Sequence, residues 1–113
     1  MNINQMKDAA SRASTLMKAL SNETRLMLLC QIGEGEKSVT ELASALEMRP
    51  ASISQQLALL RKDQLVTTRR DAQTIYYSLD GEEAKNIINV LYELYCKDME
   101  DPDDLSDQSR ARG

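Results

Sequence analysis

The sequence predicts a mainly α-helical fold with one small β-hairpin. Four Tyr are the only aromatic residues among the 113, and Leu, Ile, Met and Ala supply most of the apolar side chains, a composition that favours packed helices over a β-sandwich. Apolar residues recur at three- and four-residue intervals over most of the chain but alternate near residues 75–79. The length fits one domain, expected over residues 1–98 and followed by a disordered acidic and polar tail over 99–113.

The first twenty residues predict an amphipathic helix, because their apolar residues lie on one side of a helix of 3.6 residues per turn. These residues are Met6, Ala10, Ala13, Met17 and Leu20, with Leu16 beside them. Ser21 is then expected to cap a second helix, which Gly33 and Gly35 are expected to end. The second helix is apolar over much of its circumference, so we expect it in the centre of the core.

Two short helices then meet through a tight turn. Ser38 and Glu41 have the spacing of a capping box, which begins a helix that ends near Met48. Pro50 suits the first position of the next helix, since its missing N–H would be unpaired there anyway, and that helix is predicted to end near Asp63. The arrangement is a helix-turn-helix.

The helix over residues 50–63 separates an apolar stripe from a polar face. Ile53, Leu57 and Leu60 form the stripe, while the remaining residues are mostly small or hydrogen-bonding and would let the helix enter a DNA groove. An ordinary amphipathic surface helix is the alternative. The candidate DNA-binding residues here are Arg49, Ser52, Ser54, Gln55, Gln56 and Arg61.

A β-hairpin is predicted next, with strands over 65–70 and 75–79 and residues 71–74 between them. Arg69 and Arg70 are expected at its tip, where a DNA phosphate or minor-groove contact competes with a solvated charged turn; Gln73 is a further candidate contact. Residues 49–70 hold five basic side chains and one acidic one, although the whole chain has a net charge of −4. This local basic patch and the hairpin beside a helix-turn-helix predict a winged helix that binds double-stranded DNA.

The last helix is predicted from a capping box of Asp80 and Glu83 and runs to about Lys97. Its apolar face is wider than one small core requires, and its residues are Ala84, Ile87, Ile88, Leu91, Leu94 and Tyr95. We therefore expect the first and last helices to form a homodimer interface, as in two-fold proteins that read pseudo-palindromic operators.

Several function classes lack their usual residues. The chain has no His, no G-x-x-x-x-G-K-[ST] or G-x-G-x-x-G phosphate loop, and no carboxylate pair in an apolar pattern, so we expect neither an enzyme nor a cofactor. A dimeric protein-interaction module is the alternative outside DNA binding, and the basic 49–70 segment argues against it. No stretch has the length and apolarity of a membrane span, and the N-terminus lacks a signal-peptide pattern, so a cytoplasmic protein is expected.

The central residues resemble the winged-helix core of the ArsR-type bacterial repressors. The resemblance rests on the run S-V-T-E-L-A-S-A-L, on S-Q-Q-L-A-L-L-R-K-D-Q-L-V-T-T-R-R-D-A-Q-T-I-Y-Y-S-L, and on A-L-S-N-E-T-R-L before them, and it covers about residues 10–97. Gln56 stands where many members have His, and Gln64 where they usually have Gly. The resemblance implies a transcriptional repressor released from its operator by an inducer.

The inducer class is implied by the two cysteines. Residues 39–46 hold no Cys and the last helix holds no His, so the metal ligands of that family are missing and no metal site is expected. Cys30 and Cys96, within Leu29-Cys30 and Leu94-Tyr95-Cys96, resemble the thiol-based branch that responds to persulfides derived from sulfide. The resemblance therefore implies reactive sulfur species as the inducer. A buried structural thiol is the alternative for Cys30, and general disulfide sensing or anti-silencing activation are alternatives on the same fold.

Overall fold

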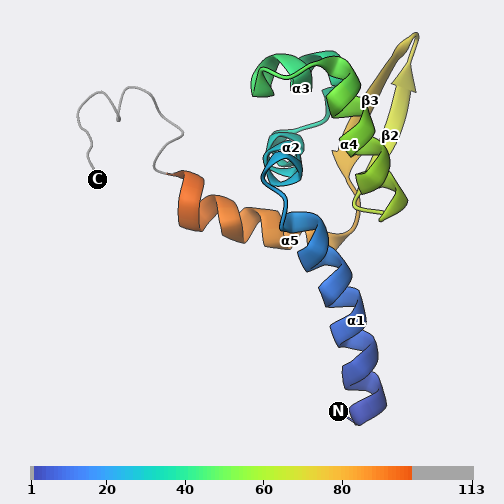
Figure 1. Cartoon of the computed structure of the whole chain (residues 1–113), viewed down its shortest axis with the longest axis vertical. Helices are drawn as coiled ribbons and strands as arrows, with labels where there is room; N and C mark the ends of the chain where they lie inside the picture. Colours follow the sequence, from blue (N-terminus) through green and yellow to red (C-terminus); the bar gives the residue numbers. More distant parts are fainter. Residues whose placement is uncertain (1, 98–113) are drawn as a thin grey trace, which may run out of the picture.

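Helix α2 (Glu23–Glu34) lies at the centre of the fold in the computed structural model, which describes residues 2–97 (Figure 1). The helices that pack against it are α1 (Ile3–Leu20), α3 (Val39–Leu46), α4 (Pro50–Lys62) and α5 (Glu82–Leu91). Leu28, Leu29 and Ile32 of α2 are buried, which confirms its predicted central position, although Met27 is exposed. The buried side chains of these helices form one core with Leu65 and Val66 from the start of the hairpin.

The predicted C-terminal end of α2 is correct, whereas the predicted N-cap is wrong. Asn22, rather than Ser21, is the N-cap, because its side-chain oxygen accepts a hydrogen bond from the backbone N–H of Arg25. Ser21 instead ends α1. Gly35 ends α2 as predicted, but Gly33 lies inside the helix, where a Cβ would come within 3.0 Å of Ile88 Cγ2. Gly33 therefore permits the close approach of α5, rather than stopping α2.

The helix-turn-helix is confirmed. Ser38 and Glu41 form both hydrogen bonds of the capping box at the start of α3. Glu47 turns the chain after α3 with a left-handed φ of 55°, and Pro50 is the first residue of α4. The predicted apolar stripe of α4 (Ile53, Leu57 and Leu60) is fully buried, so its polar side faces away from the core.

The end of α4 has a defined hydrogen-bond pattern. The backbone N–H of Leu65 donates to Leu60 O, and that of Gln64 donates to Arg61 O, which together make a Schellman motif. Gln64 occupies its left-handed position with a φ of 63°. This position usually holds glycine because a Cβ there crowds the backbone.

The predicted hairpin is the larger part of a three-stranded antiparallel sheet. Its strands are β1 (Lys37–Ser38), β2 (Val66–Asp71) and β3 (Thr74–Leu79), in the order β1-β3-β2. Strand β1 was not predicted, because two residues are too few to show a period. Pairing of β2 with β3 continues to Asp71 and Thr74, so the turn consists of Ala72 and Gln73 alone.

The predicted location of Arg69 and Arg70 at the hairpin tip is therefore wrong. Arg69 pairs with Tyr76 and Arg70 with Ile75, and both arginines lie within strand β2. The prediction failed because the polar residues on either side of the turn were assigned to a four-residue loop. Of the candidate wing residues, only Gln73 is at the tip.

The last helix begins and ends differently from the prediction. Gly81 is the N-cap of α5 and provides no side-chain bond, so the expected Asp80–Glu83 capping box is wrong; the backbone N–H of Asp80 donates instead to Leu65 O. Beyond α5 the chain forms a π-helical segment, η1 (Tyr92–Cys96), in which the N–H of Lys97 donates to Tyr92 O. The N-terminal part of α1 and the end of the last helix project from the body (Figure 1).

Two further predictions concern the C-terminal tail and membrane spans. The expected tail over 99–113 lies outside the described residues. Among residues 2–97, no helix combines the length and apolarity required to cross a membrane.

Candidate DNA interface and thiol pair

The exposed side of α4 carries the residues predicted to read DNA. Gln55 and Ser54 are exposed on its first half, and Arg61 is exposed near its end. Ser54 and Arg61 lie on one flank of Gln55. Ser52 and Gln56, which share a helix face because they are four residues apart, lie on the other flank and are half-buried. The Gln55 amide therefore lies between the two flanks, on the side opposite the buried stripe.

Two side chains of α4 are unusual for their residue type: Gln56 has a buried polar atom without a partner among residues 2–97, and Leu59 is exposed. The Oε1 atom of Gln56 is buried and has no hydrogen-bond partner within the described part of the chain. Leu59 is exposed although it is apolar, and it lies one turn beyond Gln55 on the same face. Sequence reasoning missed Leu59, although its spacing of four from Gln55 is the signal that would have found it. An apolar side chain here suits contact with a thymine methyl group.

The basic residues of the 49–70 segment are mostly free of acidic partners. Arg49, Arg61, Lys62 and Arg70 are exposed, and none of them forms an ion pair with another residue in the 2–97 region. Unpaired cations at the two ends of α4 and on β2 give this segment of an acidic chain a local positive charge. A polyanion is the ligand that such a surface attracts.

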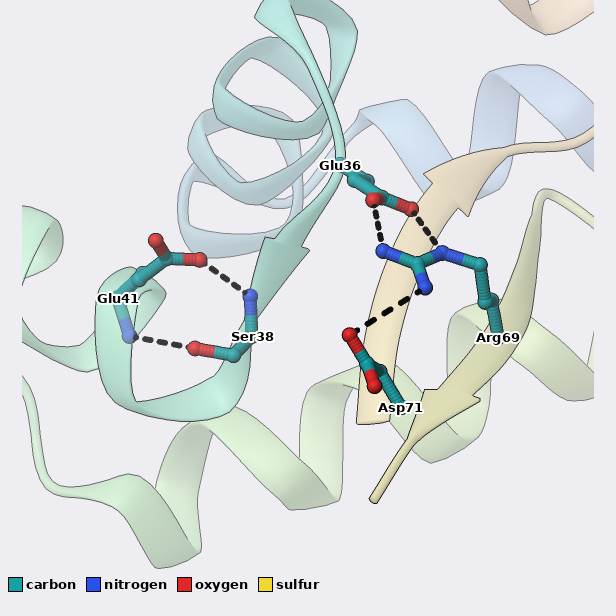
Figure 2. A network of polar contacts seen from close by, with 5 residues as sticks. All are labelled: Glu36, Ser38, Glu41, Arg69 and Asp71. Atoms are coloured by element: carbon teal, nitrogen blue, oxygen red, sulfur yellow. Dashed lines mark hydrogen bonds and ion pairs between the residues drawn. The ribbon is translucent and has the colours of Figure 1, made fainter. Parts of the chain in front are cut away.

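Arg69 is the exception in this segment. Its guanidinium binds the Glu36 carboxylate through two nitrogens, with Nε 3.1 Å from Oε2, and it lies 3.9 Å from Asp71 Oδ2 (Figure 2). The same group lies over the Tyr76 ring, 4.9 Å from its centroid. Glu36 was not identified from the sequence, because it precedes a strand of only two residues and matches no motif.

The two cysteines come from different elements, Cys30 from α2 and Cys96 from η1. Both thiols are free and half-buried. Burial raises the pKa of Cys30, and the negative charges of Cys96 and then Glu34 raise it further. Cys96 therefore contributes to the electrostatic environment of Cys30, although 66 positions separate the two residues in the sequence. No group of three or more potential metal ligands occurs among the described residues.

An apolar surface follows the projecting helices. Leu94 and Tyr95 are 68% and 71% exposed, and the other large apolar side chains on these helices are Ile3, Met6, Met17 and Val90. An open groove of about 800 Å³ separates α1 from the start of α5, and Leu16, Ala84 and Ile87 line part of it. Large continuous apolar surfaces are typical of protein interfaces, so these side chains are candidates for one.

A helix-turn-helix beside a β-hairpin, with a polar and basic helix face turned outward, defines a winged-helix DNA-binding protein. The chain belongs to the arsR family of bacterial regulatory proteins, whose family model matches residues 22–68. It is a DNA-binding transcriptional regulator of that family.

Known relatives match most of the chain. It is 45% identical over 97 residues to the transcriptional activator HlyU of Vibrio cholerae, covering 86% of this chain and 90% of that protein. It is 41% identical over 91 residues to the biofilm growth-associated repressor of Agrobacterium fabrum, covering 80% of this chain and 78% of the relative. The solved structure of reduced HlyU from Vibrio cholerae superposes with a TM-score of 0.80 at 45% identity, covering 83% of this chain and 99% of that one.

Proposed function

We propose that this regulator is a homodimeric repressor that leaves its operator when a persulfide links Cys30 to Cys96. The observation that carries this proposal is the effect of the Cys96 charge on the pKa of Cys30, because the two residues belong to different helical elements, η1 and α2. Helix α2 packs against α3 and α4, which contact DNA, and it also packs against α5, which leads into η1. A covalent link between α2 and η1 would therefore connect thiol chemistry to the DNA-binding elements.

The dimer is formed by a second copy of this chain on the apolar surface of α1, α5 and η1. Helix α1 supports this assignment, because nearly all of its side chains are exposed while Ile3, Met6 and Met17 are apolar. Pairing two copies through these helices gives two recognition helices that enter successive major grooves about 34–36 Å apart. A link that shifts η1 against α2 changes that separation, and operator affinity falls.

The chemistry balances with a persulfide, RSSH, as the only oxidant. The Cys96 thiolate attacks the outer sulfur of RSSH, the S–S bond breaks, and RS⁻ leaves as Cys96 becomes a persulfide. The Cys30 thiolate then attacks Cys96 Sγ, a disulfide forms, and HS⁻ leaves. Two thiols and one RSSH thus give one disulfide, RSH and hydrogen sulfide. A second RSSH instead gives a trisulfide, with two RSH and one hydrogen sulfide released in all.

The order of attack follows from the environment of Cys30. Burial raises the pKa of Cys30 and so lowers the fraction of its thiol that is present as thiolate, which is the nucleophilic form. We therefore assign Cys30 the role of the resolving thiol, which leaves the first attack to Cys96. The π-helical turn of η1 supports a functional role for Cys96, since such turns are frequent at functional sites.

The test compares three oxidants, each added to a separate portion of the same reduced protein. Reduced protein is treated separately with hydrogen peroxide, oxidised glutathione and glutathione persulfide; operator binding is then measured by fluorescence anisotropy and the intact mass recorded. We expect loss of binding with persulfide, together with a mass that corresponds to a disulfide or a trisulfide. Release by peroxide to the same extent would favour general disulfide sensing. Full operator binding after persulfide treatment would overturn the proposal.

Activation is a second candidate for the direction of regulation. The Vibrio cholerae relative is named a transcriptional activator, whereas the Agrobacterium fabrum relative is named a repressor. An activator that displaces a silencing protein would use the same DNA interface and the same thiols. Transcription from a promoter carrying the operator, with purified polymerase alone, distinguishes them: direct repression lowers it without any silencing protein.

A further inference from the structure

Arg69 is held by three side chains at once. Its Nε donates to Glu36 Oε2, its Nη2 donates to Glu36 Oε1, and its Nη1 lies near Asp71 Oδ2 (Figure 2). The Tyr76 ring, directly across the strand pair, covers one face of the guanidinium. Bidentate binding to a carboxylate fixes a guanidinium in orientation as well as position. Each of the three guanidinium nitrogens thus faces a carboxylate oxygen of this chain.

The charge around Arg69 differs from that around its neighbour. Two carboxylates surround the single positive charge of Arg69, so its surroundings carry no excess positive charge to offer a phosphate. Arg70, the next residue of the same strand, is exposed and has no acidic partner among residues 2–97. The two arginines are adjacent in sequence, but only Arg70 has an unpaired charge.

The segment that Glu36 belongs to joins several parts of the fold. Gly35 ends α2, and Glu36 follows it directly. Lys37 and Ser38 then pair with Tyr77 and Tyr76 of β3, and Ser38 also caps α3 (Figure 2). The bond from Glu36 to Arg69 therefore ties the outer strand of the hairpin to the point where α2 ends and the helix-turn-helix begins.

We propose that Glu36 and Arg69 form a clamp that fixes the hairpin relative to the helix-turn-helix, so that Arg69 serves DNA binding as a positioning residue while Arg70 contacts phosphate. The clamp explains why an arginine in a basic DNA-binding segment has acidic partners. Only two residue pairs join β1 to β3. The clamp adds a side-chain bond between Glu36, which precedes β1, and Arg69 of β2, the strand at the opposite edge of the sheet. The proposal requires DNA binding only and is independent of the thiol link.

Four variants of the full chain separate positioning from contact. R69E and R70E each reverse one charge, and E36R/R69E and E36R/R70E then restore the wild-type net charge in both cases. We expect E36R/R69E to bind operator within about threefold of wild type, because an arginine at position 36 can hold a glutamate at position 69. We expect E36R/R70E to remain at least as weak as R70E, because Arg70 has no bond to Glu36.

The result that would overturn the clamp is equal behaviour of the two double variants. If both recover, the arginine at position 36 acts only by attracting DNA, and if neither recovers, exchanging the two charges does not restore positioning; either result rejects the clamp. The salt dependence gives a second readout: R70Q should reduce the slope of log affinity against log salt by about one, whereas R69Q should leave it unchanged.

Wild-type protein provides a test that needs no variant. The nuclear magnetic resonance signal of the Arg69 Nε–H should shift with pH as Glu36 titrates, and the hydrogen bond from Arg69 lowers the pKa of Glu36 below its usual range. We expect this shift to persist in the complex with operator DNA. Loss of the shift on DNA binding would mean that the guanidinium has left Glu36 for a phosphate, and the clamp would be rejected.

Discussion

Cys96 lies close enough to Cys30 for its negative charge to raise the pKa of the Cys30 thiol, although the two residues belong to different helices. Burial is the larger cause of this rise, and Glu34 adds to it. A proton that the folded protein binds more tightly than the unfolded chain stabilises the fold at low pH. This contribution is lost as pH rises from the ordinary thiol range through the raised pKa.

The first prediction concerns the reactivity of Cys30 as a function of pH. Alkylation of Cys30 by iodoacetamide, followed by peptide mass spectrometry, should have a midpoint above the ordinary thiol pKa, because the thiolate is the reacting form. Cys96→Ser should lower that midpoint only in part, since burial remains. Ser54→Ala, an exposed serine on α4, is the control and should change nothing. An unchanged midpoint in Cys96→Ser would show that the two thiols are not coupled.

The second prediction concerns base recognition by α4. Gln55→Ala should weaken operator binding by about 1–3 kcal/mol, the range for a bidentate contact with adenine, and should hardly change binding to random duplex DNA. Titration of both DNAs at one salt concentration measures the difference. Lys62→Ala is the matched control, because loss of an exposed cation should weaken both DNAs alike. Equal losses on both DNAs for Gln55→Ala would exclude it as a base-reading residue.

The third prediction concerns the dimer. Leu94→Lys introduces a charge on the exposed apolar surface and should give monomers with weak operator binding, because an unpaired buried charge is costly. Leu91 is a poorer test position, since it packs against the core of its own subunit. Gln73→Lys adds the same charge at the hairpin tip and should remain a dimer. Sedimentation equilibrium at micromolar concentration decides, and a monomeric wild type would contradict the scheme.

The fourth prediction concerns the end of α4. Gln64→Gly should raise the free energy of unfolding by about 1 kcal/mol, because glycine adopts a left-handed φ without the crowding that a Cβ causes. Ala58→Gly, an exposed position inside the same helix, should lower it by about 1 kcal/mol. Urea unfolding measures both. A destabilised Gln64→Gly would mean that the glutamine side chain supports this turn.

Periodic patterns predicted most of the fold. The stripe of Ile53, Leu57 and Leu60 identified the buried side of α4, and the Ser38–Glu41 spacing identified the start of α3, because both depend on residues close together in sequence. The alternation over residues 75–79 identified the inner strand of the hairpin. The N-cap of α2 was assigned wrongly because Ser21 and Asn22 are adjacent and both residue types can cap a helix; Asn22 is the one that does.

The remaining features depend on contacts between distant parts of the chain. Gly33 looked like a helix end, but its lack of a side chain accommodates Ile88 of α5. The partner of Arg69 is 33 residues away, and no sequence period relates it to Glu36. The π-helical turn that ends in Cys96 also has no pattern that distinguishes it from an α-helix. The sequence thus predicted most of the candidate DNA-binding residues, whereas exposed Leu59 and the acidic partner of Arg69 were found only in the three-dimensional structure.

The central claim is that a link between Cys30 and Cys96 releases DNA, and operator titration of the single-cysteine variants tests it most directly. Cys30→Ser and Cys96→Ser should each bind operator like the reduced wild type, before and after persulfide treatment. The wild type should lose at least about tenfold in affinity on treatment, which corresponds to about 1.4 kcal/mol. If either single variant still releases operator DNA when persulfide is added, the paired-cysteine mechanism is wrong.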